Sequence, residues 1–249
     1  MVKAATPSQI EHYREHGWVK IPGLFSQDEV AKATTRVEAF MQGGANDLQG
    51  RHINRTKGEI NSIHRLQDDD WINNVLNSEE MKTFARQFLD DDAEPRKCEL
   101  FAKPARVGLP SPAHQDNYLF CIMGGNALTI WVALDPAADD NGALYYYDGS
   151  HKSGVLPHVK SFAPGTSQRI ADDVDLTVFE KVVPHLDRGD VLVHHSEIIH
   201  GSEANSSAQS RRGWTLQYKG RKAQYDEVRI AQYEADLAEQ LSARGQAER

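Results

Sequence analysis

Ala113-His114-Gln115-Asp116-Asn117-Tyr118 is the stretch on which the interpretation of this 249-residue chain depends. Its His-x-Asp pair sets an imidazole and a carboxylate two residues apart, which on an extended strand means the same face. A second, histidine-rich stretch further along the chain ends in His200-Gly201-Ser202. Two histidines and one carboxylate are the facial ligand set that binds iron(II) and leaves coordination positions open. We therefore predict that His114, Asp116 and His200 bind one metal ion.

Taken alone, a His-x-Asp pair is a weak signal, and a lone histidine is more often hydrogen-bonded than metal-bound. Other residues along the chain strengthen the prediction of a metal site. Gly189–Val193 predicts a strand that leads toward His200, and Arg211 follows that histidine by eleven residues. A guanidinium can bind a planar carboxylate through two parallel N–H bonds, a geometry that lysine does not reproduce. Arg212 would point to the opposite face of a strand, so we assign Arg211 to the pocket.

The bulk composition excludes several classes of protein. Hydrophobic residues make up 39% of the chain and charged residues 26%, which is ordinary for a globular protein. The net charge of −8 argues against a nucleic-acid binder. No apolar run is long enough to cross a bilayer, and the N-terminus lacks the apolar core of a signal peptide. Cys98 and Cys121 lie in apolar, strand-like contexts and indicate buried thiols in a reducing compartment. We expect a cytoplasmic protein that binds neither nucleic acid nor a membrane.

Helical patterns dominate the first third of the chain. Ser8–Gly17 predicts a short helix, and Trp18–Ile21 predicts the strand that follows it. A capping box at Ser26–Glu29 opens a second helix that runs to about Met41, before Gly43-Gly44. Ser78–Leu89 predicts a third helix.

From Cys98 onward the pattern changes to short strand-like segments separated by clusters of Pro, Gly, Asn and Asp. This density of strands favours a sandwich or barrel over alternating β-α units. The helical pattern returns at residues 223–243, with an apolar stripe so narrow that it predicts packing on the barrel or on a partner subunit. We predict a single domain with a helical layer at about 6–90, a barrel core at about 96–220 and a C-terminal helix at about 223–243. The expected strands are Glu99–Lys103, Ala127–Leu134, Ala143–Tyr147, Leu176–Phe179, Asp190–His194 and Trp214–Tyr218.

Residues 45–70 reverse the local charge of this acidic chain. The simpler interpretation is a solvated loop with a strand near Glu59–Ile63. The alternative is a lid that contacts an anionic substrate, such as a carboxylate, phosphonate or phosphate, through Arg51, Arg55 and Arg65.

An ordered set of motifs spans nearly the whole chain: His114-Gln115-Asp116, residues 128–135, residues 141–144, Gly149-Ser150-His151-Lys152, Gly189-Asp190, His200-Gly201-Ser202, Asn205, Ser207, Arg211 and Tyr218. Through this set the chain resembles the phytanoyl-CoA dioxygenase family of iron(II)/2-oxoglutarate-dependent oxygenases. The opening helix-strand-helix, from Pro7 to Met41, is also similar to that of the family. An ordered motif set is far more specific than any one of its elements.

The resemblance implies a mainly β fold, a double-stranded β-helix (a jelly-roll or cupin-like barrel) with flanking α-helices and a metal near one mouth. It implies that Arg211 and Ser202 bind the distal carboxylate of 2-oxoglutarate, with Lys103 as a second polar contact. Thr129 and Trp131 alternate with their neighbours on a strand, so either this pair or Leu128 and Ile130 faces the pocket. The sequence leaves that choice open, and Thr129 is a further candidate contact to the cosubstrate.

Candidates for contact with the prime substrate lie beside the ligands and on one later strand. They are Asn117, Tyr118 and Tyr145. His194 and His195 match the end of a strand in the family, and not its metal position.

The chemistry that the resemblance implies is oxidation of a C–H bond of a small molecule by dioxygen. It is coupled to decarboxylation of 2-oxoglutarate to succinate and carbon dioxide, with ascorbate as an optional supporting reductant. Halogenating relatives carry a small residue in place of the carboxylate, so Asp116 favours hydroxylation or a related oxidation. Desaturation and cleavage stay open as outcomes, as do a monomer and a homodimer.

Two other functional classes are consistent with parts of the pattern. A barrel that binds a metal and a small ligand without redox turnover fits the fold, but Arg211 and Ser202 would then have little purpose. A zinc-dependent hydrolase is a third class, which usually has three histidines or a nearby general base.

Overall fold

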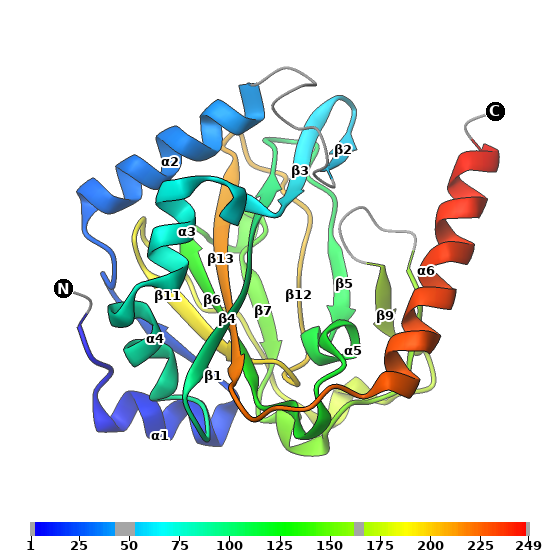
Figure 1. Ribbon diagram of the computed structural model, residues 1–249. Helices are drawn as coiled ribbons and strands as arrows, with labels where there is room; N and C mark the ends of the chain where they lie inside the picture. Colours follow the sequence, from blue (N-terminus) through cyan, green and yellow to red (C-terminus); the bar gives the residue numbers. More distant parts are fainter. Residues whose placement is uncertain (1–2, 43–52, 162–166, 248–249) are drawn as a thin grey trace.

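The structure is a computed structural model that describes residues 3–42, 53–161 and 167–247, with side chains described as far as residue 240. Figure 1 shows two β-sheets that face each other. Helices α1 to α4 lie against the outer face of the larger sheet, and α6 stands on the opposite side of the molecule. This arrangement is the predicted mainly β barrel with flanking helices.

The helices lie mostly at the two ends of the described chain. They are α1 (Pro7–His16), α2 (Gln27–Gln42), α3 (Asp70–Asn77), α4 (Glu79–Arg86), α5 (Asp116–Phe120) and α6 (Glu227–Ala247). Short 3₁₀ turns are η1 (Leu66–Asp68), η2 (Met123–Gly125), η3 (Asp139–Asn141), η4 (Ser150–Ser153) and η5 (Leu176–Val178). The strands are β1 (Trp18–Ile21), β2 (Ile53–Thr56), β3 (Glu59–His64), β4 (Ala93–Lys103), β5 (Ser111–His114), β6 (Ala127–Ala133), β7 (Leu144–Tyr147), β8 (His158–Lys160), β9 (Gln168–Ile170), β10 (Lys181–Val182), β11 (Val191–His195), β12 (His200–Ser202) and β13 (Arg211–Gly220).

Within the described residues, the larger sheet has the strand order β1-β11-β6-β13-β4-β3-β2 and the smaller one has β10-β7-β12-β5. Every pairing in both sheets is antiparallel. Strands β8 and β9 form a separate ribbon. The two histidines predicted as metal ligands therefore come from the smaller sheet, and the predicted arginine comes from the larger one.

Strand β6 shows how the larger sheet packs against the helices on one face and lines the space between the two sheets on the other. All seven of its residues are buried, because both faces of the strand are covered. Leu128, Ile130 and Val132 pack with the helices in the main core, whereas Thr129 and Trp131 line the space between the two sheets. The choice that the sequence left open is thus decided in favour of Thr129 and Trp131.

The helices cover the larger sheet because their apolar side chains pack against the apolar face of that sheet. Val30, Ala33 and Val37 of α2 are almost fully buried, as are Met81 and Phe84 of α4. They share one core with Trp214 and Leu216 of β13. Ser78 caps α4 by accepting a hydrogen bond from the backbone N–H of Met81, which is where the sequence predicted that helix to begin.

Several elements differ from the sequence predictions. Leu176–Phe179 was predicted to be a strand, but Leu176–Val178 forms a 3₁₀ turn whose start Asp175 caps through the backbone N–H of Thr177. This prediction was wrong because a local cap outweighed the β propensity of Leu-Thr-Val. Helix α3 was not predicted, although Asp69 caps it through the N–H of Ile72. Gly43-Gly44, the predicted end of α2, lies outside the described residues. No helix in the described part of the chain is both long and apolar enough to span a membrane.

A glycine in β13 makes room for the buried indole of Trp131. A Cβ added at Gly213 would lie 1.9 Å from Cζ2 of Trp131, well inside van der Waals contact. We therefore expect Gly213→Ala to destabilise the fold by roughly 1–3 kcal/mol through overpacking. Thermal unfolding followed by circular dichroism measures the effect.

The matched test is the double variant Gly213→Ala with Trp131→Leu. If the indole causes the strain, the double variant loses less stability than the sum of the two single losses. Simple additivity would contradict this explanation.

Candidate active site

The space between the two sheets holds a cavity of about 410 Å³, a volume typical of small-molecule sites. Strands β4, β6, β11 and β13 form one wall, and β5, α5 and β12 form the other. Tyr233, Leu237 and Gln240 of α6 also line the cavity, as do Asn54, His64, Leu144 and Ser167. The helix is held there by hydrogen bonds to Ser167: the hydroxyl of Tyr233 lies 3.2 Å from its Oγ, and the amide of Gln240 donates to its carbonyl at 2.9 Å. The C-terminal helix therefore packs on the barrel.

His114, Asp116 and His200 meet in this cavity. His114 and His200 are direct partners in the antiparallel pairing of β5 with β12, and their ring centres lie 4.4 Å apart. Oδ1 of Asp116 lies 3.9 Å from Nε2 of His114 and 3.8 Å from Nε2 of His200. One ligand atom from each of the three side chains lies within 4.8 Å of the others. This spacing suits three ligands on one face of a single ion.

Asp116 does not lie on the strand that carries His114. Strand β5 ends at His114, and Asp116 is the first residue of α5. The expectation of one continuous strand was therefore wrong. Gln115 is nevertheless extended, with φ −119° and ψ 129°, so the side chains on either side of it still point to the same side.

The tautomers of both histidines are set by backbone carbonyls. Nδ1 of His114 lies 2.9 Å from the carbonyl of Pro112, and Nδ1 of His200 lies 3.1 Å from that of Ile198. Because each Nδ1–H donates to a carbonyl, each Nε2 keeps its lone pair directed into the cavity. Burial lowers the pKa of His200 to about 3 and also lowers that of His114. Both imidazoles are therefore neutral and ready to act as ligands.

Two residues orient the carboxylate of Asp116. The hydroxyl of Thr129 donates to Oδ2 at 2.7 Å, and Nε2 of His194 lies 3.3 Å from the same oxygen. His194 is held in turn by the hydroxyl of Tyr146, 2.9 Å from its Nδ1. Burial raises the pKa of Asp116, but the bond to His194 and the neighbouring imidazoles outweigh it and hold the pKa well below its usual range. The ionised carboxylate thus keeps Oδ1 available, and the donor set fits a divalent cation such as iron(II).

Arg211 lies in the same cavity with its charge unbalanced. It is 2% exposed, its Nε donates to the carbonyl of Gly142 at 3.0 Å, and its guanidinium lies 5.3 Å from the ring centre of Trp131. Burial lowers the pKa of Arg211 only to about 10, so the group stays charged. In the described residues no carboxylate forms an ion pair with it, whereas neighbouring Arg212 binds Asp135 on the opposite face. A buried cation of this kind requires an anion.

Ser202 and Lys103 have different positions relative to that guanidinium. Ser202 is 2% exposed and lines the main cavity together with Arg211. Lys103 instead lines a small adjoining space of about 30 Å³, which Arg211 also lines, and its ammonium donates to the carbonyl of Leu109. Burial, with Arg211 nearby, lowers its pKa to about 6. The structure therefore brings Ser202 to the cavity and leaves Lys103 outside its lining.

The residues proposed for substrate contact are not brought to the cavity. The amide of Asn117 is fully buried and bonded to Ile122 and Glu197. The ring of Tyr118 stacks on His158 at 4.2 Å, and that of Tyr145 lies beneath the ammonium of Lys181. None of Asn117, Tyr118 and Tyr145 is among the lining residues.

The same holds for the arginines of the basic segment, although Asn54 and His64 of that segment line the cavity. Arg51 lies outside the described residues. Arg55 is exposed and donates to the carbonyl of Gly58, and Arg65 is 3.6 Å from Asp68. Neither Arg55 nor Arg65 lines the cavity. Where the structure describes this segment, it does not bring the two arginines to the site.

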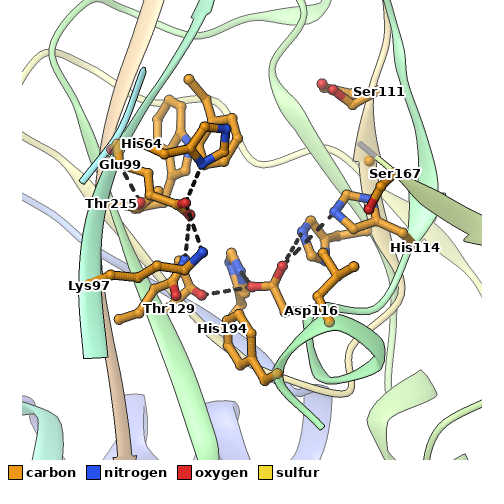
Figure 2. A pocket seen from close by; sticks show the side chains of 18 of the residues that line it. His64, Lys97, Glu99, Ser111, His114, Asp116, Thr129, Ser167, His194 and Thr215 are labelled. Carbon is orange, nitrogen blue, oxygen red and sulfur yellow. Dashed lines mark hydrogen bonds and ion pairs between the residues drawn. The ribbon is translucent and has the colours of Figure 1, made fainter. Parts of the chain in front are cut away.

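A charged cluster in the cavity was missed by the sequence analysis. Figure 2 shows Glu99 between His64 and Lys97, across the cavity from His114 and Asp116. Burial raises the pKa of Glu99, but the bonds from His64 and Lys97 outweigh it and lower the pKa to about 2. The available signal was a glutamate within the apolar run Cys98-Glu99-Leu100-Phe101, where an unpaired charge would be costly.

Comparison with known proteins decides the family. The phytanoyl-CoA dioxygenase (PhyH) family model matches residues 13–213. The chain belongs to the phytanoyl-CoA dioxygenase family. It is 28% identical over 223 residues to a protein of Stutzerimonas stutzeri named "Probable alpha-ketoglutarate-dependent hypophosphite dioxygenase", covering 84% of this chain and 77% of that one.

Solved structures share the fold of this chain. EctD from S. alaskensis, in its apoform, superposes with a TM-score of 0.74 at 21% identity, covering 91% of this chain and 81% of that one. The epimerase SnoN in complex with Fe3+, alpha ketoglutarate and nogalamycin RO superposes with a TM-score of 0.71 at 21% identity, covering 88% and 84%. The predicted jelly-roll fold and the enzyme class, a 2-oxoglutarate-dependent dioxygenase, are confirmed, as are iron and 2-oxoglutarate as cofactors.

The hydroxyl of Thr129 is open to a direct test. Thr129→Val keeps the shape of the side chain and removes its hydrogen bond to Asp116. We expect the affinity for iron(II) to fall about 10- to 100-fold, as is typical when a group that orients a metal ligand is lost. Anaerobic titration with iron(II) measures it. Thr35→Val, on the exposed face of α2, is the matched control and should bind iron(II) like the wild type. Unchanged affinity in Thr129→Val would remove the orienting role.

Proposed function

We propose that this enzyme hydroxylates a C–H bond of a small organic molecule while 2-oxoglutarate is decarboxylated to succinate and carbon dioxide. The observation that carries the proposal is one cavity that contains both a His-Asp-His ligand set and a buried arginine without a carboxylate partner among the described residues. The first suits a metal with open positions, and the second suits the carboxylate of a keto acid.

Each residue has a role in this proposal. His114, Asp116 and His200 hold the metal on one side, and Thr129 and His194 fix the direction of the carboxylate. Arg211 binds the distal carboxylate of 2-oxoglutarate, and Ser202, which lines the same cavity, is the second contact to it. When bound, iron(II) with 2-oxoglutarate and dioxygen supplies the oxidant for the C–H bond.

The protein also has to keep water from the reacting atoms. Helix α6 closes one side of the cavity and is held there by Ser167 through Tyr233 and Gln240. The apolar side chains of Leu119, Phe120 and Leu237 line the same region. A dry site favours productive oxidation of the bound substrate over side reactions.

Hydroxylation is the proposed outcome because Asp116 occupies the third ligand position and leaves no place for a halide. The fold by itself does not select the reaction. SnoN is described as an epimerase, and the Stutzerimonas relative is named for hypophosphite. Desaturation and cleavage therefore remain alternative outcomes of the same chemistry. The cytoplasmic location and the choice between monomer and homodimer stay predictions.

A barrel that binds a metal without turnover is the second candidate from the sequence. The family match and the unbalanced charge of Arg211 both favour turnover over this alternative.

Removal of one imidazole tests the metal site. We expect His114→Ala to abolish iron-dependent formation of succinate from 2-oxoglutarate, because two ligands would hold the ion too weakly. The assay contains iron(II), ascorbate and dioxygen, and succinate is measured by chromatography. Near-normal succinate formation in an iron-replete assay would contradict the ligand assignment.

The two adjacent arginines offer a matched pair for the cosubstrate. Arg211→Lys keeps the charge but loses the planar fork, so we expect the KM for 2-oxoglutarate to rise about tenfold or more. Arg212→Lys makes the same change on the opposite face, where the side chain binds Asp135 and Glu38. It should lower the stability and leave that KM unchanged. The reverse pattern would assign the cosubstrate to Arg212.

A further inference from the structure

Strand β4 contains an irregularity on the cavity wall. Along β13, Gln217 pairs with Lys97 and Tyr218 pairs with Pro95, so Arg96 has no partner in the ladder. Such a bulge disturbs the alternation of the strand and redirects a side chain. Neighbours on a regular strand point to opposite faces, yet Arg96 and Lys97 both line the cavity. The bulge thus adds a second cation to this wall.

The guanidinium of Arg96 is held in place but not neutralised. Its Nη1 donates to Oε1 of Gln217 at 3.1 Å, and its Cζ lies 4.0 Å from the ring centre of Phe120. Its Nε is buried and has no hydrogen-bond partner. Within residues 3–42, 53–161 and 167–240, no carboxylate forms an ion pair with Arg96.

The carboxylate of Glu99, on the same strand, already forms hydrogen bonds with other residues. Glu99 accepts hydrogen bonds from Lys97 at 2.9 Å and from Nε2 of Gln217 at 2.8 Å, and it also contacts His64. These bonds fix the amide of Gln217 with its oxygen toward Arg96. Lys97 is therefore balanced by Glu99, and no carboxylate of the described residues balances the partly exposed Arg96.

Arg96 lies at a different part of the cavity from the arginine assigned to 2-oxoglutarate. Arg211 and Gln217 are six residues apart on β13, which corresponds to roughly 20 Å along a strand. Gln217 pairs directly with Thr129, whose hydroxyl donates to Asp116. The guanidinium of Arg211 nevertheless reaches back along the barrel to Trp131, 5.3 Å from the ring centre and two residues from Thr129 on β6, so the metal ligands lie within reach of both arginines. Strand β4 is two strands, about 10 Å, from β6.

We propose that the prime substrate is an organic anion, a carboxylate or a phosphonate, whose charged group binds the guanidinium of Arg96. Its apolar part lies against Leu119, Phe120 and Leu237, which line the same cavity. Arg96 is then the residue that selects anionic over neutral substrates. This inference rests on the proposed function, since it assigns Arg211 to the keto acid and Arg96 to the substrate.

The test measures binding under nitrogen to the iron(II)-loaded enzyme with saturating 2-oxoglutarate, so that the Arg211 end is occupied. The probes are butyrate, hexanoate and 3-phenylpropionate, each compared with its primary amide, and propylphosphonate compared with its dimethyl ester. Isothermal titration calorimetry gives the Kd values. The phosphonate arm distinguishes the two kinds of anion.

We expect at least one anion to bind the wild type about tenfold or more tightly than its neutral counterpart, as one charged hydrogen-bonded pair provides. In Arg96→Gln that preference should fall below about threefold, and in Arg96→Lys it should be intermediate, because the charge remains without the fork. Arg86→Gln makes the same change in an exposed arginine of α4 and should keep the full preference.

If no anion binds the wild type better than its neutral counterpart, or if the preference survives in Arg96→Gln, the proposal is overturned. Circular dichroism of each variant verifies the fold. Succinate formation by the wild type is measured separately, and an absence of succinate would contradict the proposed function itself. If succinate forms but the wild type shows no preference for anions, only the role of Arg96 is contradicted.

Discussion

The pairing of His114 with His200 across β5 and β12 is the constraint on which the site depends. Direct partners in an antiparallel ladder have their side chains on one face and close together, so the backbone register itself sets the distance between the two imidazoles. The extended conformation of Gln115 then turns Asp116 toward the same point. A shift of one residue in that register would send one imidazole to the opposite face.

Around the metal ligands, the two arginines of the cavity lie toward opposite ends of β13. Arg211 lies toward one end of β13 with its charge unbalanced, and Arg96 lies beside the other end of the same strand on the bulge of β4. Glu99 neutralises Lys97 between them. A cavity with a cation toward each end and one ligand set can hold two anions in a fixed order, which is what a cosubstrate and an anionic substrate require.

The sequence predicted the parts of the site that repeat a recognisable motif. The ligand set, Arg211 and Ser202 stand in an ordered pattern, and the structure brings them to one cavity. The contacts to substrate were not predictable in this way. Asn117 is next to a ligand in sequence but is saturated by Ile122 and Glu197, whereas Arg96 reaches the cavity only because a bulge redirects it. Neither burial of an amide nor a shift in register is visible in a single sequence.

The central claim is that three side chains of this chain hold iron beside a keto acid. An anomalous difference map at the iron edge, from crystals grown without oxygen in iron(II) and 2-oxoglutarate, tests it most directly. The account predicts one peak within bonding distance of Nε2 of His114, Nε2 of His200 and Oδ1 of Asp116, with the distal carboxylate of 2-oxoglutarate on Arg211. A peak held by other residues, or a keto acid directed away from Arg211, would contradict it.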